Sequence, residues 1–246
     1  MYDFGGKIVV VTGAAKGLGY AMAERFLKDG AKGLAILDLQ ESAAKEATAR
    51  LDPSKSRTLA LACDVSDKEA VRAAFKEVAD TLGPVDILVN NAGATRDGFA
   101  HKMDEDNFKF GIDVNLNSAF YCTRQVIPAM RERGWGRVIF LSSTAAFGNL
   151  GQCNYSAAKA GLIGLTNTLS LELGGKGITV NCVAPGLIET DIIKTVPEAT
   201  MQALLARNPA GRLGSPQEVA NLVAFLASDQ AAYISGECIK ICGGFR

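Results

Sequence analysis

Residues 7–19 read KIVVVTGAAKGLG, an unbroken apolar run that leads directly into a glycine-rich turn. The run predicts a buried strand, because it lacks the polar alternation of a strand with one face in water. Glycines at Gly13, Gly17 and Gly19 would let the backbone turn tightly and come close to a pyrophosphate. Apolar spacing in residues 20–30 predicts a helix, whose free N–H groups and positive dipole end would favour the same phosphate. We therefore expect the first unit of a nucleotide-binding sheet.

The same alternation continues to the end of the chain. Further strands are predicted at residues 34–39, 58–65, 85–91, 136–143, 178–186 and 237–244, with helical spacing in segments such as 67–83 and 216–228. Continuous apolar strands are typical of a parallel sheet covered on both faces. We predict an α/β fold with one doubly wound, Rossmann-type parallel sheet sandwiched by helices. Because no linker or charge run divides the chain, residues 1–246 should form a single domain.

The composition excludes several classes of function. Lys plus Arg equals Asp plus Glu at 26 each, which gives no electrostatic footprint for nucleic acid or an anionic membrane. No apolar run approaches the ~18 residues of a membrane span. The six cysteines form no CxxC pair and have no histidine at ligand spacing, so we expect no metal site. With no secretion signal at the start, we expect a cytoplasmic protein with reduced thiols.

An acidic residue closes the second predicted strand. In such sheets ligands bind beyond the carboxyl ends of the strands, and Asp38 lies there. Its carboxylate could accept hydrogen bonds from an adenosine ribose and would repel a 2′-phosphate, which predicts NAD rather than NADP. Lys16 argues weakly the other way, because a basic side chain in the turn could reach that phosphate. The alternative role for Asp38 is a carboxylate at a helix N-terminus.

The next two strands also end in polar residues. Asp64 closes the third and could meet an adenine edge, whereas Asn90 and Asn91 end the fourth beside small residues that would let the chain pass a ribose. For each of these, turn formation is the competing explanation.

Tyr155 and Lys159 are four residues apart, so on a helix their side chains would share one face. A solvated helix face explains such a pair equally well. The chemical alternative is proton exchange: a tyrosine pKa of ~10 is too high for a base at neutral pH, and a neighbouring ammonium favours the phenolate.

Taken together, these motifs resemble the short-chain dehydrogenase/reductase family, and within it the 3-oxoacyl-thioester reductases. TGAAKGLG, DV, NNAG, the asparagine in DVNL, the serines after GRVIFL, YSAAK and APGLIET follow the family's order over nearly the whole chain. The resemblance implies that Tyr155 is the general acid/base, that Lys159 also holds the nicotinamide ribose, and that Asn115 links this lysine to bulk water. The implied cofactor contacts are Gly13, Lys16, Gly17, Leu18, Gly19, Asp38, Asp64, Val65, Asn91, Ala92, Gly93, Tyr155, Lys159, Pro185, Gly186, Ile188 and Thr190.

Two adjacent serines compete for the remaining catalytic position. The family's usual spacing back from Tyr155 gives Ser142, whereas counting from the strand end in GRVIFL gives Ser143. A one-residue slip in a strand would turn its side chains to the opposite face, whereas a loop tolerates a deletion. We therefore prefer Ser143, with Ser142 close behind, as donor of a hydrogen bond to the substrate oxygen.

The expected activity is NAD(H)-dependent interconversion of a secondary alcohol and a ketone. The resemblance implies a 3-hydroxyacyl/3-oxoacyl thioester on CoA or acyl carrier protein, a homotetramer, and a substrate lid at about residues 190–214. Biosynthetic relatives typically use NADPH, so Asp38 favours oxidation of the alcohol. Arg131, Arg133 and Arg137 could receive an acidic carrier, or simply form a solvated helix end. The alternatives are a dehydrogenase of cyclic or other bulky secondary alcohols or polyols, and a non-catalytic NAD(H)-binding regulator.

Overall fold

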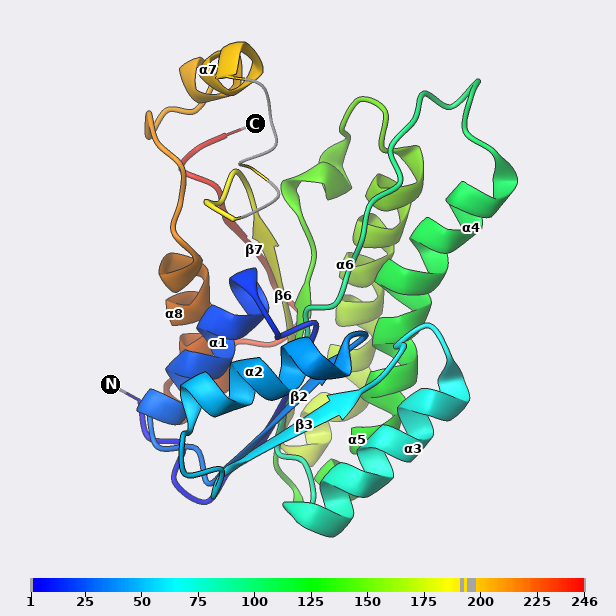
Figure 1. The fold of residues 1–246 in the computed structure, drawn as a ribbon. Coiled ribbons are helices and arrows are strands. Elements are labelled where there is room, and N and C mark those ends of the chain that lie inside the picture. The colour runs from blue at the N-terminus through cyan, green and yellow to red at the C-terminus, as the bar shows by residue number, and fades with distance from the viewer. Residues whose placement is uncertain (1, 191–192, 194–197, 246) are drawn as a thin grey trace.

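The computed structural model describes residues 2–190, 193 and 198–245. Its seven strands form one sheet in the order β3-β2-β1-β4-β5-β6-β7, and all neighbouring pairs are parallel (Figure 1). The strands are β1 (Ile8–Thr12), β2 (Gly33–Asp38), β3 (Thr58–Ala62), β4 (Ile87–Asn90), β5 (Gly136–Leu141), β6 (Ile178–Pro185) and β7 (Cys238–Ile241). Every predicted strand is present, and the predicted fold class is confirmed. The strand order reverses between β1 and β4, the point at which such sheets bind ligands.

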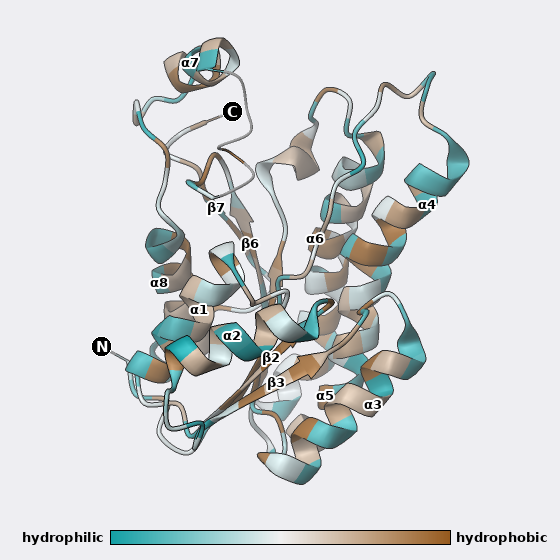
Figure 2. Ribbon diagram, viewed as in Figure 1, coloured by the Kyte–Doolittle hydropathy of each residue, from teal (hydrophilic) through white to brown (hydrophobic). Residues whose placement is uncertain are grey.

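Helices cover both faces of the sheet (Figure 1). One face carries α1 (Gly17–Lys28), α2 (Glu41–Leu51) and α8 (Pro216–Ala227), and the other carries α3 (Lys68–Thr81), α5 (Ser118–Arg133) and α6 (Cys153–Leu173). Helix α4 (Glu105–Ile112) packs beside α6 and continues into α5 through η1 (Asp113–Asn117), a π-helical turn. The 3₁₀ turns are η2 (Thr144–Phe147), η3 (Gly174–Lys176) and η5 (Asp229–Ala231). Figure 2 shows hydrophobic residues along the strands and hydrophilic residues on the outer turns of the helices.

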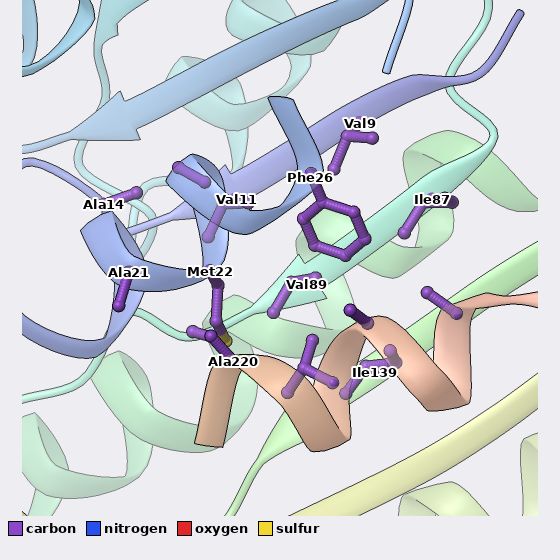
Figure 3. Close-up of a cluster of buried hydrophobic side chains, with 14 of the residues drawn as sticks. Val9, Val11, Ala14, Ala21, Met22, Phe26, Ile87, Val89, Ile139 and Ala220 are labelled. Carbon is purple, nitrogen blue, oxygen red and sulfur yellow. The ribbon is translucent and has the colours of Figure 1, made fainter. Parts of the chain in front are cut away.

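The two hydrophobic cores explain why the strands lack polar alternation. Successive residues of β1 point to opposite faces, so that Val9 packs under α1 and α8 while Val10 packs under α3 and α5. Phe26 of α1 is fully buried in the first of these cores, which Figure 3 shows together with Met22. Burial of such a side chain contributes about 1.5–3 kcal/mol. Both strand faces must therefore be apolar, and only the strand ends are left for polar chemistry.

The predicted lid, residues 190–214, lies in part outside the described residues. Within its described part, α7 (Glu198–Ala206) stands beyond the carboxyl ends of β6 and β7, and none of the residues of this helix is buried (Figure 1). The opening and closing of this segment stays a prediction. Among the described residues, no helix has the length and hydropathy needed to cross a membrane.

Candidate active site

The glycine turn between β1 and α1 is open toward the strand ends. Gly13 and Gly17 have φ angles of 62° and 59°, in the left-handed region that favours glycine. A Cβ on Gly19 would lie 2.3 Å from the Gly13 carbonyl oxygen, whereas one on Gly17 would meet nothing within 4 Å. Lys16 is the N-cap residue of α1, and its side chain forms no capping hydrogen bond. The first turn of α1 therefore has no side-chain cap and has room beside Gly17, which fits a phosphate group.

Asp38 borders this turn. Its carboxylate accepts hydrogen bonds from the backbone N–H groups of Ala15, at 3.1 Å, and Gln40, at 3.3 Å. The first bond joins the end of β2 to the phosphate turn, so the negative charge lies beside the place predicted for the adenosine ribose. Lys16 is exposed at the start of α1, next to Ala15 in the chain. The structure therefore brings together both of the charges that bear on cofactor choice.

Just beyond β3, the Asp64 side chain forms hydrogen bonds within its own turn. Asp64 accepts hydrogen bonds from the backbone N–H of Ser66 at 2.9 Å and from its hydroxyl at 2.6 Å. Asp64 is nevertheless exposed, whereas Val65 is buried in the core on the α3 side. Turn formation thus accounts for one oxygen of the Asp64 carboxylate, and contact with an adenine edge stays a prediction.

The segment after β4 is bonded to the glycine turn. Asn91 donates from Nδ2 to the carbonyl oxygens of Thr12 at 2.9 Å and Gly13 at 2.8 Å. The Thr12 hydroxyl accepts from the backbone N–H groups of Asn91 and Ala92, both at 3.0 Å. A Cβ on Gly13 would lie 2.8 Å from the Cα of Ala92, so only glycine permits this approach. The preceding Asn90 instead donates to the Thr123 hydroxyl inside the protein.

The two candidate serines occupy different environments. The Ser143 hydroxyl is close enough to the Tyr155 side chain to lower its pKa, and its Oγ accepts from the backbone N–H of Ala145 at 3.1 Å. Ser142 is buried, and its hydroxyl donates to the backbone carbonyl of Lys159 at 2.8 Å. Of the two, only Ser143 lies beside the Tyr155 side chain, whereas Ser142 supports the helix behind it.

Lys159 lies under the tyrosine. Its Nζ is 5.4 Å from the centre of the Tyr155 ring and donates to the Leu141 carbonyl at 2.7 Å. Complete burial lowers the pKa of Lys159 to about 8. Burial also raises the pKa of Tyr155 above its ordinary value; the Ser143 hydroxyl acts in the opposite direction, and the Asp97 carboxylate adds to the rise. The ammonium thus lies within cation–π range of the phenol ring, but burial raises the pKa of Tyr155 more than the Ser143 hydroxyl lowers it.

Asn115 and Lys159 flank the same small residue. A Cβ on Gly93 would lie 2.6 Å from Asn115 Oδ1 and 3.4 Å from Lys159 Nζ. The buried Asn115 side chain donates to the carbonyl oxygens of Ala94 at 2.8 Å and Gly111 at 3.0 Å. Asn115 lies in the π-helical turn η1, a type of irregularity that is frequent at functional sites. Its side chain is thus occupied by backbone partners, and the predicted water path past it stays a prediction.

The segment after β6 borders the site at its other side. Pro185 is the last residue of β6, and the backbone N–H of Gly186 donates to the Ile241 carbonyl at 3.0 Å. Ile188 is buried and pairs with Gly214. The Thr190 carbonyl accepts a hydrogen bond from the N–H of Ile193 at 3.1 Å. Contact of these residues with a nicotinamide stays a prediction.

Three polar residues that hold the tyrosine helix were missed in the sequence. Asn154 is fully buried; it donates to the carbonyls of Arg96 and Asn107, both at 3.0 Å, and accepts from the N–H of Tyr155 at 2.7 Å. Gln152 donates to the Asp97 carboxylate at 2.8 Å. Polar residues at the N-cap of α6, Gln152, and in its first turn, Asn154, are the local signal of this role. Among the described residues, no group of three or more potential metal ligands is found.

The chain is similar over nearly its whole length to a known protein family and to several named proteins. Residues 13–246 match the family described as Enoyl-(Acyl carrier protein) reductase. The chain is 43% identical over 243 residues to the 3-oxoacyl-[acyl-carrier-protein] reductase FabG of Escherichia coli (strain K12), covering 98% of each chain. It is 42% identical over 240 residues to FabG of Vibrio cholerae, covering 97% of each. It is also 40% identical over 238 residues to the (2S)-[(R)-hydroxy(phenyl)methyl]succinyl-CoA dehydrogenase subunit BbsD of Thauera aromatica, covering 97% of this chain and 96% of that one.

Proposed function

We propose that this chain, which belongs to the short-chain dehydrogenase/reductase family, is an oxidoreductase that uses NAD(H) to interconvert the 3-hydroxyacyl and 3-oxoacyl forms of a thioester. One observation carries the proposal. The Ser143 hydroxyl and the Lys159 ammonium both lie beside the Tyr155 side chain, and Lys159 and Asn115 lie on either side of Gly93, in the segment bonded to the glycine turn. The residues proposed for proton transfer and the turn proposed to bind the nucleotide are thereby connected.

Tyr155 is the proposed proton carrier for the substrate oxygen. In oxidation it accepts the hydroxyl proton, and in reduction it returns a proton to the oxygen. The Ser143 hydroxyl donates a hydrogen bond to the same oxygen and stabilises the charge that develops there. The bound nicotinamide supplies the hydride chemistry. With a pKa of about 8, Lys159 is mostly cationic at neutral pH and keeps a positive charge against the tyrosine ring.

The preference for NAD rests on charge at the end of β2. Asp38 is bonded to the phosphate turn through Ala15, so a 2′-phosphate would meet a carboxylate there. Lys16 is exposed at the start of α1 and carries the opposing charge. We expect the carboxylate to dominate, because its hydrogen bond to Ala15 fixes it, whereas an exposed lysine would lose side-chain entropy on pairing.

The substrate class is supported by the relatives. The FabG proteins are named for an acyl-carrier-protein thioester, and the Thauera aromatica relative for a CoA thioester with a phenyl-bearing secondary alcohol. An arginine site for an acidic carrier gains no support from Arg133 and Arg137. Arg133 bonds to Asp86 before β4, and Arg137 is buried at the start of β5 beside Asp229. Both lie at the amino ends of the strands, away from Tyr155, and we therefore favour CoA esters.

The predicted homotetramer and cytoplasmic location stay predictions. Phe108 in α4 and Phe120 in α5 are 42% and 45% exposed, which is compatible with a subunit contact over these helices. Light scattering after size exclusion would measure the oligomeric state.

The test is a comparison of Tyr155→Phe with Tyr121→Phe, a matched change on α5. With NAD and 3-hydroxyacyl-CoA esters, Tyr155→Phe should lower kcat by about 10²–10⁴-fold, because only the transferable proton is lost. Nucleotide affinity, measured by fluorescence titration, should stay unchanged in both variants. Near-normal kcat in Tyr155→Phe would exclude the assigned proton transfer. Cyclic alcohols and polyols belong in the same panel: turnover of these alone would exclude the thioester, and nucleotide binding without any turnover would favour a regulator.

A further inference from the structure

Two cysteines meet behind the candidate active site. Cys182 in β6 and Cys238 in β7 are register partners in adjacent parallel strands, so their side chains point to the same face of the sheet. Both pack into the core on the side of α5 and α6. Cys182 is fully buried, whereas Cys238 is partly exposed on the edge strand of the sheet. The two thiols are close enough to shift one another's pKa, that of Cys182 upward and that of Cys238 downward.

The pair is connected to the catalytic helix through Ser142. The backbone N–H of Ser142 donates to the carbonyl of Val183, the residue after Cys182, and the Ser142 hydroxyl donates to the Lys159 carbonyl, both at 2.8 Å. Ser142 is also close enough to Cys182 to lower the pKa of its thiol. Cys182 is also close enough to Lys159 to affect the pKa of its ammonium, which negative charge on the thiol raises. A displacement of the Cys182 sulfur would therefore shift the helical turn that carries Lys159.

We propose that Cys182 and Cys238 form a redox-sensitive dithiol, and that a hydroperoxide converts it to a disulfide that lowers turnover. In the first step the Cys238 thiolate attacks one oxygen of the peroxide. The O–O bond breaks, the departing oxygen takes a proton and leaves as water or an alcohol, and Cys238 becomes a sulfenic acid. In the second step the Cys182 sulfur attacks the Cys238 sulfur. An S–S bond forms, and the sulfenic oxygen leaves as water with the Cys182 proton.

The roles of the two thiols follow from their surroundings. The neighbouring Cys182 thiol and the Lys240 ammonium lower the pKa of Cys238, and together they outweigh burial and the Glu237 carboxylate, which raise it. The interaction between the two thiols, together with burial, raises the pKa of Cys182. Because the thiolate is the nucleophile, the more acidic and more exposed Cys238 should react with peroxide first. Cys182 then serves as the resolving thiol.

The spacing of the strands permits the bond and makes it reversible. Neighbouring strands lie roughly 4.8 Å apart, and disulfides span Cα separations of about 4.4–6.8 Å. Side chains that stand side by side on parallel strands are farther apart than the ~3.8 Å Cβ separation of a relaxed disulfide. The cross-link should therefore be strained, and strained disulfides are the labile and regulatory ones.

The expected effect on activity follows from the Ser142 contact. Bond formation draws the Cys182 sulfur toward β7 and away from Ser142, whose hydroxyl supports the Lys159 turn. A misplacement of ~1 Å in a catalytic constellation can lower the rate about 10²-fold. We expect a loss of turnover between about tenfold and 100-fold in the oxidised protein, restored by dithiothreitol.

The test uses the full chain with Cys153→Ser, because Cys153 is exposed two residues before Tyr155. The protein is treated with hydrogen peroxide, free thiols are blocked with N-ethylmaleimide, and non-reduced peptides are mapped by mass spectrometry. We expect a cross-linked peptide joining Cys182 and Cys238, together with the reversible loss of turnover. Cys238→Val should abolish both effects, whereas Cys242→Ser, a nearby thiol outside the pair, should change neither.

Each contrary result is decisive. Absence of the cross-linked peptide would overturn the dithiol, and a cross-link without loss of turnover would overturn its effect on activity. An equal loss in Cys238→Val would assign the inhibition to another residue. The cross-link is measured on the protein without substrate, so failure of the proposed function would leave this part of the test intact.

Discussion

Replacing each of the two adjacent serines by alanine should give two different defects. Ser143→Ala removes the hydroxyl that meets Tyr155, whereas Ser142→Ala removes the donor to the Lys159 carbonyl inside the protein. The first change should therefore act on catalysis and the second on stability. Because the residues are neighbours, the pair also serves as its own control for local disturbance of the chain.

The magnitudes follow from the partners of each hydroxyl. Loss of a donor that stabilises developing charge on an oxygen lowers kcat about 10²–10³-fold, which we expect for Ser143→Ala. The same change removes the hydroxyl that lowers the pKa of Tyr155, so the remaining activity should need a higher pH. Ser142→Ala loses one buried neutral hydrogen bond, worth about 0.5–1.5 kcal/mol. For a chain of this size, each kcal/mol lowers Tm by roughly 2–4 °C.

Steady-state kinetics with NAD and the substrate identified in the panel, together with thermal unfolding of both variants, separates these effects. We expect Ser143→Ala to keep most of its Tm and to lose turnover. Ser142→Ala should show a small fall in Tm and a modest change in kcat. The reverse order of kcat losses would refute the reasoning, because it would mean that the serine bonded to the Lys159 carbonyl is the one that reaches the substrate.

Three further predictions concern cofactor choice, pH dependence and stability. Asp38→Asn should narrow the ratio of kcat/KM for NAD over NADP, because it removes the charge that repels a 2′-phosphate; a wild-type preference for NADP would show that Lys16 dominates. Asp97→Asn removes a carboxylate that raises the pKa of Tyr155, so the ascending limb of the oxidation rate should move to lower pH, whereas the surface change Asp106→Asn should leave the profile in place. Asn154→Ala leaves two partly buried carbonyls and the Tyr155 amide without this partner, and should lower the free energy of unfolding by about 2–4 kcal/mol in urea denaturation. An unchanged urea midpoint in Asn154→Ala would mean that water replaces the lost partner.

The fold was readable in the sequence because the strands inside the sheet, from β2 to β6, are buried on both faces. A residue such as Val9 or Val10 must be apolar whichever core it enters, so the strands stand out as continuous runs. The serine preference also came from the strand. Leu141 is the last residue of β5 and pairs with Val183, which leaves Ser143 beyond the sheet beside Tyr155.

The hydrogen bonds that hold the candidate site together could not be predicted from the sequence, because the residues that they join are distant in the chain. Gln152 and Asp97 are 55 residues apart, and no local pattern announces their hydrogen bond. The environment of Tyr155 was not readable for the same reason. That the Lys159 ammonium, together with a bound nicotinamide, favours the phenolate stays a prediction, whereas burial alone acts in the opposite direction and raises the pKa of Tyr155. Burial of this kind depends on packing between elements, which the four-residue spacing does not show.

One loop, residues 91–98, fixes the nucleotide half of the site relative to the catalytic half. At its start Asn91 is bonded to the glycine turn, and in its middle Gly93 lies between Asn115 and Lys159. Near its end the backbone and side chains hold Asn154 and Gln152, which begin the helix of the tyrosine. Hydride and proton transfer act on neighbouring atoms of one substrate, so both halves must keep a fixed separation. Because one short loop bonds to both halves, a shift of this loop would disturb nucleotide binding and proton transfer together, unlike a change at the end of β2 or at the serine.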